Sequence, residues 1–246
     1  GITVKDTKTG ATLAEGTDYD LSYNGDTTNV GTVTVTVNGT GNYSGTVAQT
    51  YQITPATLTA TVTKNQSKVY DGTTTADALG DGYTLAGYVN GESGATLTSS
   101  SAAYNSKNVA DASSVIYSGL SLSDSNYTLG NAVTTLSGAG SIAAAELTAA
   151  VTKEQSKVYD GTTTADALGT DYTLTGLVSV DTGKVALSGT DASGQYNSKD
   201  VTAARSVTYS GLGLTGEESG NYTLSGVTSL KGMGSITPAM LTANCG

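Results

Sequence analysis

The sequence contains no histidine, tryptophan or phenylalanine, and its only cysteine is Cys245. Without histidine, Ser-His-Asp and Cys-His catalytic sites and histidine-ligated metal sites are excluded. These absences predict a protein that is not an enzyme and has no resident cofactor, although a glycosidase with paired carboxylates stays open. No disulfide can form within the chain. Cys245 is therefore either a cloning remnant or an intermolecular crosslink.

Basic residues and long apolar runs are also scarce. Eleven Lys and Arg stand against 21 Asp and Glu, giving a formal net charge of −10, and no region is a basic patch. Binding to nucleic acid or to an anionic membrane is therefore disfavoured. No run reaches the roughly 18 apolar residues of a membrane span, so we expect no membrane insertion of this segment. Proline is rare (2 residues) and glycine abundant (32 residues), which favours strands joined by tight turns.

A long internal repeat organises the chain. LTATVTKNQSKVYDGTTTADALG, which begins at Leu58, returns with two substitutions as LTAAVTKEQSKVYDGTTTADALG from Leu147, a spacing of 89 residues. That period is the length of a small domain rather than of one solenoid coil. The two repeats differ in length in three stretches, which we predict to be exposed loops: Val178–Gln195, Thr215–Gly220 and Gly226–Leu230.

Alternating residues predict β-strands throughout. In TVTVTV, period-two alternation places Val33, Val35 and Val37 on a buried face and three threonines outward. The same reasoning places Tyr19, Leu21 and Tyr23 on one face, and Val47, Tyr51 and Ile53 on another. Tyrosine is the only aromatic residue, with 15 copies, so we expect narrow cores of Val, Leu, Ile, Ala and Tyr.

The phrase ITPATLTA marks a module boundary and recurs as IAAAELTA and ITPAMLTA. Each copy ends one module and begins the next without a flexible linker. The predicted fold is therefore all-β, a tandem array of small β-sandwich modules of immunoglobulin-like type joined end to end. The expected modules are an N-terminal module at 1–54, two repeats at 55–143 and 144–238, and the start of a further repeat or a tail at 239–246.

The Asp-Gly pair within KVYDGTTTADAL is a turn signal, because Gly adopts positive φ and an Asp carboxylate accepts backbone N–H groups two residues on. A catalytic role for Asp71 and Asp160 is the alternative, and turn capping is favoured because the motif occurs twice on adjacent modules. The six candidate structural residues are Tyr70, Asp71, Gly72, Tyr159, Asp160 and Gly161.

Two resemblances add to these patterns. GTVTVTVNGTGNYSGTVAQTYQITPA resembles the short bacterial immunoglobulin-like modules of MBG type, in which another strand normally lies upstream, so Gly1 is expected to lie inside a module. KVYDGTT followed by YNSK, YSGL, NYTL and a final GxGSI, in the same order twice, resembles the YDG repeat of very large bacterial adhesins. That resemblance implies an extracellular β-rich stalk at the bacterial surface.

The expected function is accordingly a structural spacer of a secreted cell-surface adhesin that projects a distal binding region. The expected partners are neighbouring repeats of the same protein. The alternative is an adhesive module that binds host or matrix glycan or protein, or that self-associates into head-to-tail fibres by donation of an end strand. Calcium between surface carboxylates is a further alternative, but no D-x-D-x-D-G loop occurs and ordinary solvated acids are favoured.

Overall fold

The computed structural model describes residues 2–130, 133–225 and 228–243. These residues form two compact units, each made of several chain segments. Unit 1 comprises Gly1–Thr63, Ala78–Ser101 and Tyr117–Leu136, and unit 2 comprises Lys64–Asp77, Ala102–Ile116 and Ser137–Gly246. With 47% of the residues in strands and 3% in helical turns, the predicted all-β class is confirmed.

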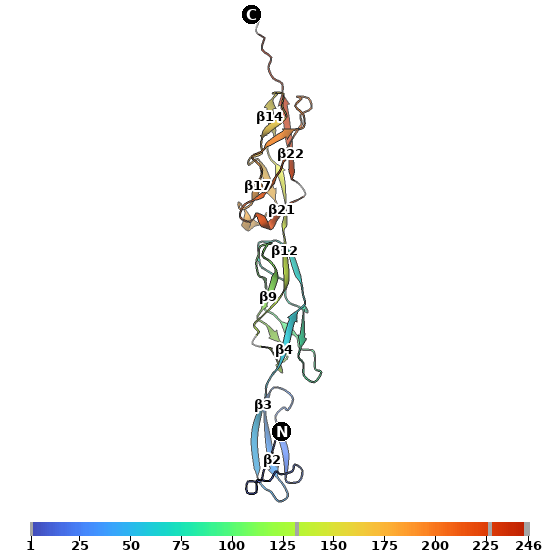
Figure 1. Ribbon diagram of the computed structural model, residues 1–246, viewed down its shortest axis with the longest axis vertical. Helices are drawn as coiled ribbons and strands as arrows, with labels where there is room; N and C mark the ends of the chain where they lie inside the picture. Colours follow the sequence, from blue (N-terminus) through green and yellow to red (C-terminus); the bar gives the residue numbers. More distant parts are fainter. Residues whose placement is uncertain (1, 131–132, 226–227, 244–246) are drawn as a thin grey trace. The chain divides into compact units, whose positions relative to one another are not determined.

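The strands follow one another with short connections (Figure 1). Those of unit 1 are β1 (Tyr19–Asn24), β2 (Gly31–Gly39), β3 (Thr46–Ile53), β4 (Ala56–Val62), β6 (Tyr83–Ala86), β7 (Leu97–Thr98), β10 (Ser121–Leu122) and β11 (Tyr127–Leu129). Three strands have residues in both units: β8 (Ser101–Tyr104), β9 (Ser114–Ser118) and β12 (Thr135–Ala143).

Unit 2 holds the remaining elements. They are β5 (Gln66–Val69), β13 (Ala145–Val151), β14 (Gln155–Val158), β15 (Thr164–Ala167), β16 (Tyr172–Thr175), the 3₁₀ turn η2 (Ser179–Asp181), β17 (Ala186–Ser188), β18 (Ser193–Tyr196), β19 (Ser206–Ser210), β20 (Gly213–Thr215), the 3₁₀ turn η3 (Ser219–Asn221), β21 (Tyr222–Leu224) and β22 (Ser229–Thr237).

The prediction of a loop over Val178–Gln195 is therefore wrong in part, because this segment contains η2, β17 and most of β18. Residues 226–227 of the third predicted loop lie outside the described residues.

The two repeats share one strand arrangement, except that the second has one additional strand, β15. The first has the sheets β11-β4-β6, β10-β7 and β5-β12-β9-β8, and the second has β16-β13-β21, β17-β20 and β14-β22-β19-β18-β15. In each, the strand after the Asn-Tyr pair runs parallel to the first strand of the repeat, with Tyr127 opposite Ala56 and Tyr222 opposite Ala145. This pairing brings the Asn-Tyr pair to the start of its own repeat.

Tyrosine fills the cores, as the composition predicts. In the second repeat Tyr196 and Tyr209 pack with Val207, Leu187 and other buried aliphatic residues. The tyrosine rings pack directly against glycine residues, which leave room for them. A Cβ added to Gly194 would lie only 2.7 Å from the Tyr209 ring. The equivalent Tyr104 and Tyr117 of the first repeat are also buried, at 4% and 0% exposure.

The N-terminal sheet, in the order β1-β2-β3, fits the predicted alternation in part. Val33 and Val35 are 0% and 4% exposed, which confirms the inward face of β2. Val47, Tyr51 and Ile53 share one face of β3 as predicted, but Val47 is 58% and Tyr51 is 42% exposed. The strand lies at the edge of a three-stranded sheet, and among the described residues it pairs with β2 alone, with Tyr51 opposite Val33 and Val47 opposite Val37.

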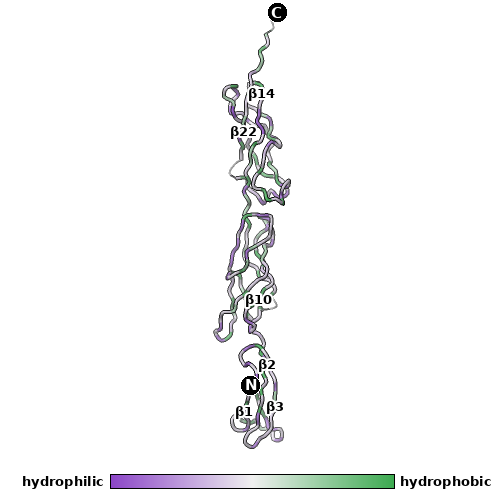
Figure 2. Tube along the Cα trace, turned by 180° about the vertical axis from the view of Figure 1, so that it is seen from behind, coloured by the Kyte–Doolittle hydropathy of each residue, from purple (hydrophilic) through white to green (hydrophobic). Residues whose placement is uncertain are grey.

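In Figure 2 hydrophobic and hydrophilic stretches alternate at short intervals along the chain. Within the described ranges, no helix has the length and apolar character needed to cross a bilayer.

Candidate functional site

The two Tyr-Asp-Gly turns follow β5 and β14 and have the same internal geometry. The Asp71 carboxylate accepts hydrogen bonds from the backbone N–H and the hydroxyl of Thr73, both at 2.9 Å. Asp160 accepts the same pair from Thr162, also at 2.9 Å. Gly72 and Gly161 have φ values of 78° and 80°, as the turn requires. Turn capping by both aspartates is confirmed.

A lysine completes each turn. Lys68 donates to the carboxylate of Asp71 at 2.8 Å, and Lys157 donates to that of Asp160 at 2.9 Å. The hydrogen bond from Lys157 is the main reason that the pKa of Asp160 falls to about 2. Both aspartates are exposed and ionised, and their carboxylates are occupied by the turn itself.

The tyrosines of the two turns have different surroundings although their local sequences match. The Tyr70 side chain is 3% exposed, whereas that of Tyr159 is 38% exposed. Residues of the second repeat cover Tyr70: its ring meets the ring of Tyr222 edge-on, with centroids 5.3 Å apart. A Cβ on Gly72 would lie 3.0 Å from Val180, whereas Gly161 has open space around it. The first turn is therefore part of a contact between the repeats within unit 2.

Asp181 lies at the centre of this contact, at the end of η2, and is fully buried. The Tyr70 hydroxyl donates to its Oδ2 at 2.9 Å and the Tyr222 hydroxyl donates to the same oxygen at 2.7 Å. Lys184 Nζ lies 4.0 Å from Oδ1. A buried carboxylate is costly unless it is paired or hydrogen-bonded. The two tyrosines satisfy Oδ2, whereas Oδ1 accepts no hydrogen bond from the described residues and has only the charge of Lys184 near it.

An ion pair extends the hydrogen bonds. Lys107 Nζ lies 2.8 Å from Oε1 and 2.9 Å from Oε2 of Glu218, and also donates to the Tyr70 hydroxyl at 3.3 Å. We call the five residues Tyr70, Lys107, Asp181, Glu218 and Tyr222 the Asp181 network. Two of them come from the first repeat and three from the second, so the network ties the repeats together within unit 2.

Asn221 adds a backbone contact beside the network. Its Oδ1 accepts a hydrogen bond from the backbone N–H of Val109 at 2.9 Å. Its Nδ2 donates to Glu218 at 2.7 Å and to Asn108 Oδ1 at 3.3 Å. Asn221 is 5% exposed, so these partners replace water for most of its polar atoms.

Unit 1 contains the same contact at the preceding boundary. Asn126 Oδ1 accepts from the backbone N–H of Val30 at 2.8 Å, and its Nδ2 donates to Asn29 Oδ1 at 2.6 Å. The Tyr127 hydroxyl donates to the carboxylate of Glu92, which stands 89 positions before Asp181 in the repeat register. The ring of Tyr88 meets Tyr127 edge-on at 5.3 Å. An Asn-Tyr pair and an acid therefore recur at both boundaries, whereas the second tyrosine comes from the preceding repeat in one case (Tyr70) and from the same repeat in the other (Tyr88).

The pKa values in the Asp181 network keep both tyrosines neutral and Asp181 charged near pH 7. Burial alone raises the pKa of Asp181, but hydrogen bonds from Tyr222 and Tyr70 and the charges of Lys107 and Lys184 bring it below its ordinary value of 3.8. Burial and the bond to Asp181 raise the pKa of Tyr222 to about 12. The hydrogen bonds that Lys107 donates to Glu218 raise the pKa of Lys107.

We predict that unit 2 is most stable between about pH 5 and pH 9. The lowered pKa of Asp181 contributes stability that is present above its unfolded value near 3.8 and is lost as the pH falls through the folded value. The raised pKa of Tyr222 contributes stability that is lost as the pH rises from about 10 to about 12. Thermal unfolding at a series of pH values measures both limits. If the stability of Asp181→Asn falls with decreasing pH in the same way as that of the wild type, the acid limit does not come from Asp181.

This site can hold one repeat against the other. Its side chains offer tyrosine hydroxyls, amides and paired charges, and none of them is an activated nucleophile. Within residues 2–130, 133–225 and 228–243, no group of three or more His, Cys, Asp or Glu side chains is placed to hold a metal ion. Cys245 lies outside the described residues.

The sequence prediction singled out Tyr70 but missed Asp181, Asn221 and Glu218. The recurring NYTL motif was the available signal for Asn221.

The comparison with known families agrees with the repeat. The YDG domain family matches residues 54–135 and 143–229, which together make up more than half of the chain. Among curated proteins, none matches this sequence. The two matched segments contain both Tyr-Asp-Gly turns and both buried Asn-Tyr pairs. The chain therefore belongs to the YDG domain family, as two consecutive copies of the domain.

Proposed function

We propose that this chain is a non-catalytic structural spacer of a secreted bacterial surface adhesin. In this proposal its modules are small immunoglobulin-like β-sandwiches, residues 1–54 are a module of MBG type, and the array carries a distal binding region away from the cell. The observation that carries the proposal is the recurrent boundary contact, in which Asn126 and Asn221 each bind the module before them. A spacer needs such contacts because they restrict motion between successive modules.

The distribution of tyrosine supports the same proposal. Three tyrosine pairs at equivalent places in the two repeats are buried in both copies, and the largest exposure among them is 6%. These pairs are Tyr104 with Tyr196, Tyr117 with Tyr209, and Tyr127 with Tyr222. A binding module that recognises glycan or protein through tyrosine exposes several such rings on one loop surface. Buried pairs indicate that tyrosine serves packing here.

Solution scattering of the full chain tests the proposal, at concentrations where it is monomeric and in a Cys245→Ser background. We expect the same profile with and without calcium, and a more flexible particle when Asn126→Ala and Asn221→Ala loosen both boundaries. Ser123→Ala with Ser219→Ala, two changes beside the same Asn residues, is the matched control and should leave the profile unchanged. A particle equally flexible with intact and altered boundaries would refute the spacer function.

The second candidate is an adhesive surface on the N-terminal sheet. Tyr23, Val47 and Tyr51 are 52%, 58% and 42% exposed, which leaves apolar side chains of β1 and β3 open to a partner. Binding to arrayed glycans or matrix proteins that is saturable in the wild type and lost in Tyr23→Ser with Tyr51→Ser would favour adhesion. The spacer proposal expects neither protein to bind.

A further inference from the structure

The first and last strands of each repeat pair with each other and run in the same direction. In the second repeat β13 pairs parallel with β21, and β14 pairs parallel with β22, with Val158 opposite Thr237. The first repeat has the equivalent parallel pairs, β4 with β11 and β5 with β12. In every pair one strand comes from the start of the repeat and the other from its end. We call the pairs β5-β12 and β14-β22 the terminal ladders; β14 and β22 are labelled in Figure 1.

The parallel direction determines how a terminal ladder carries tension. When the chain is pulled at both ends, β14 is drawn toward its own beginning and β22 toward its own end. Because the strands are parallel, these two directions are opposite along one line, and the strands must slide past each other. Sliding loads the evenly spaced hydrogen bonds of a parallel pair together, whereas a pair that is pulled apart from one end opens them one after another. The terminal ladder therefore resists tension as a unit.

A backbone bond and buried packing extend the ladder of the second repeat up to the Tyr-Asp-Gly turn. The Tyr159 N–H donates to the Thr237 carbonyl at 2.8 Å, one step beyond the last residue of β14. Ile236, which lies opposite Lys157 in the register, is 3% exposed. β14 is an edge strand, and among the described residues β22 is the strand that joins it to its sheet. The first strand of the sheet is therefore held by this ladder.

The lysine of each Tyr-Asp-Gly turn holds that turn closed. Lys157 Nζ donates to the Asp160 carboxylate, the Thr162 hydroxyl and the Thr164 carbonyl, at 2.8 to 2.9 Å. Lys68 makes the equivalent three bonds in the first repeat. These bonds connect the end of the edge strand to the segment that follows the turn.

The segment beyond the turn is itself held in the sheet. The Tyr196 N–H of β18 donates to the Thr163 carbonyl at 2.7 Å, and β15 pairs with β18. Lys157 Nζ also lies 5.5 Å from the centroid of the Tyr196 ring. Because the closed turn cannot lengthen, β14 can slide along β22 only if the segment after the turn is pulled away from β18. Tension on the edge strand is thereby shared with the rest of the sheet.

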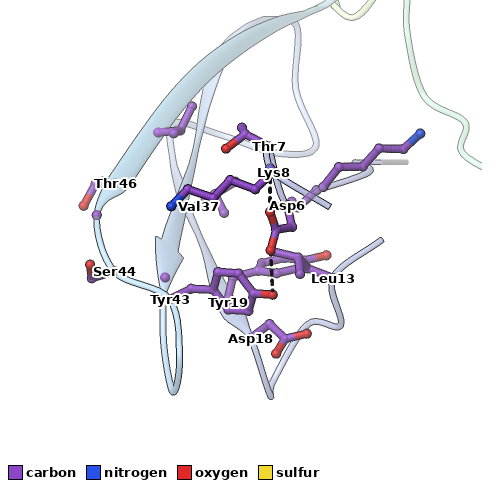
Figure 3. A pocket seen from close by; sticks show the side chains of 15 residues that line it. Asp6, Thr7, Lys8, Leu13, Asp18, Tyr19, Val37, Tyr43, Ser44 and Thr46 are labelled. Carbon is purple, nitrogen blue, oxygen red and sulfur yellow. Dashed lines mark hydrogen bonds between the residues drawn. The ribbon is translucent and has the colours of Figure 1, made fainter. Parts of the chain in front are cut away.

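The N-terminal sheet is built differently. Its strands β1 and β3 each pair antiparallel with β2, so its first and last strands share no ladder. The residues before β1 are held in part by a side-chain bond, from the Tyr43 hydroxyl to Asp6 Oδ2 at 3.3 Å (Figure 3). A cavity of about 560 Å³ lies beside this bond. Within the described ranges the terminal ladder is therefore a feature of the two repeats.

We propose that the terminal ladder of each repeat is a mechanical clamp, and that the Tyr-Asp-Gly turn with its lysine is the anchor of this clamp. The clamp rests on the proposed spacer function, because a spacer between a cell and a distal binding region is pulled along its chain. It adds that the repeats withstand tension while folded. It also gives the repeated Tyr-Asp-Gly motif a role that does not require a ligand.

Optical-tweezers measurements on the full chain test the clamp, because the second repeat can be pulled in two directions. Cys245 is the only cysteine, so one added cysteine provides two thiols for DNA handles. Glu154→Cys lies just before β14 and loads the terminal ladder by sliding, whereas Val158→Cys, at the other end of β14, pulls the ladder open from one end. Both positions are exposed, so the two variants should have the same unfolding midpoint in urea.

We expect unfolding at one constant force to be at least about tenfold slower through Glu154→Cys than through Val158→Cys, because sliding breaks several hydrogen bonds together. An extension of roughly 250 to 300 Å identifies unfolding of the second repeat in both cases. Equal rates in the two directions would overturn the clamp.

Lys157→Met tests the anchor in the sliding direction. Loss of its three bonds should raise the unfolding rate through Glu154→Cys about tenfold at the same force. Lys153→Met, which removes an exposed lysine paired with Asp171 at 3.4 Å, is the matched control and should change the rate about twofold or less. Equal effects of the two substitutions would overturn the role of the turn. These outcomes do not depend on the boundary contacts of Asn126 and Asn221, so the scattering test of the spacer proposal can fail or succeed separately.

Discussion

Asp181→Ala should lower the free energy of unfolding of unit 2 by about 3 to 5 kcal/mol. The substitution leaves the hydroxyls of Tyr70 and Tyr222 without their shared acceptor in a fully buried place. It also removes the negative charge that faces Lys107 and Lys184. Removing one partner from a buried charged network costs more than the network contributes, because the remaining polar groups stay desolvated. Urea denaturation followed by tyrosine fluorescence measures the loss.

Glu92→Ala provides a matched control for this prediction. Glu92 occupies the same position of the first repeat and accepts from Tyr127, but its side chain is exposed. Water can replace the lost acceptor there, so we expect a cost below about 1 kcal/mol. Hydrogen exchange should show the faster opening of Asp181→Ala in the segments around Tyr70 and Tyr222. Equal losses for the two variants would mean that burial of the acid does not determine the effect.

Tyr209→Ala should cost about 3 to 5 kcal/mol, a large part of the stability of a domain this small. The ring is 2% exposed, packs within the main cluster of the second repeat, and lies on Gly194. A repeat of roughly 90 residues has a small core, so one lost aromatic ring removes a large share of the buried apolar area. Loss of β-sheet circular dichroism on heating, compared with the wild type, gives the size of the effect.

The first repeat and the N-terminal sheet supply the comparisons. Tyr117→Ala removes the equivalent ring and should destabilise the first repeat to a similar extent. Tyr51→Ala removes a ring that is 42% exposed and should cost under about 1 kcal/mol. A Tyr209→Ala protein as stable as Tyr51→Ala would contradict the view that tyrosine packing holds the repeat.

The sequence predicts local structure well where one strand or one turn decides the outcome. Alternation identified Val33 and Val35 as buried, and the Asp-Gly signal identified the caps at Asp71 and Asp160. Both are determined by residues within a few positions of each other. For β3 alternation does not decide burial, because period two shows which side chains share a face and does not show how much of that face is covered at the edge of the sheet.

The boundary contact could not be derived from sequence spacing. Asp181 and Tyr70 are 111 residues apart, and Asp181 lies in a segment where the two repeats differ in length. In the sequence it was one isolated acid among many. Tyr70 and Tyr159 show the same limit, since identical local sequences give a buried side chain in one turn and an exposed side chain in the other. Only the residues that pack on each turn make the difference, and these come from another repeat.

The Asn221 contact and the Asp181 network hold the end of the first repeat against the second within unit 2. Distance measurement between two spin labels, at Asp111→Cys and Asp191→Cys in a Cys245→Ser chain, tests it most directly, because both positions are exposed and lie in unit 2. We predict a single narrow distance distribution that broadens when Asp181→Ala and Asn221→Ala are added. A distribution that is equally broad with the contact intact and with it removed would contradict the claim.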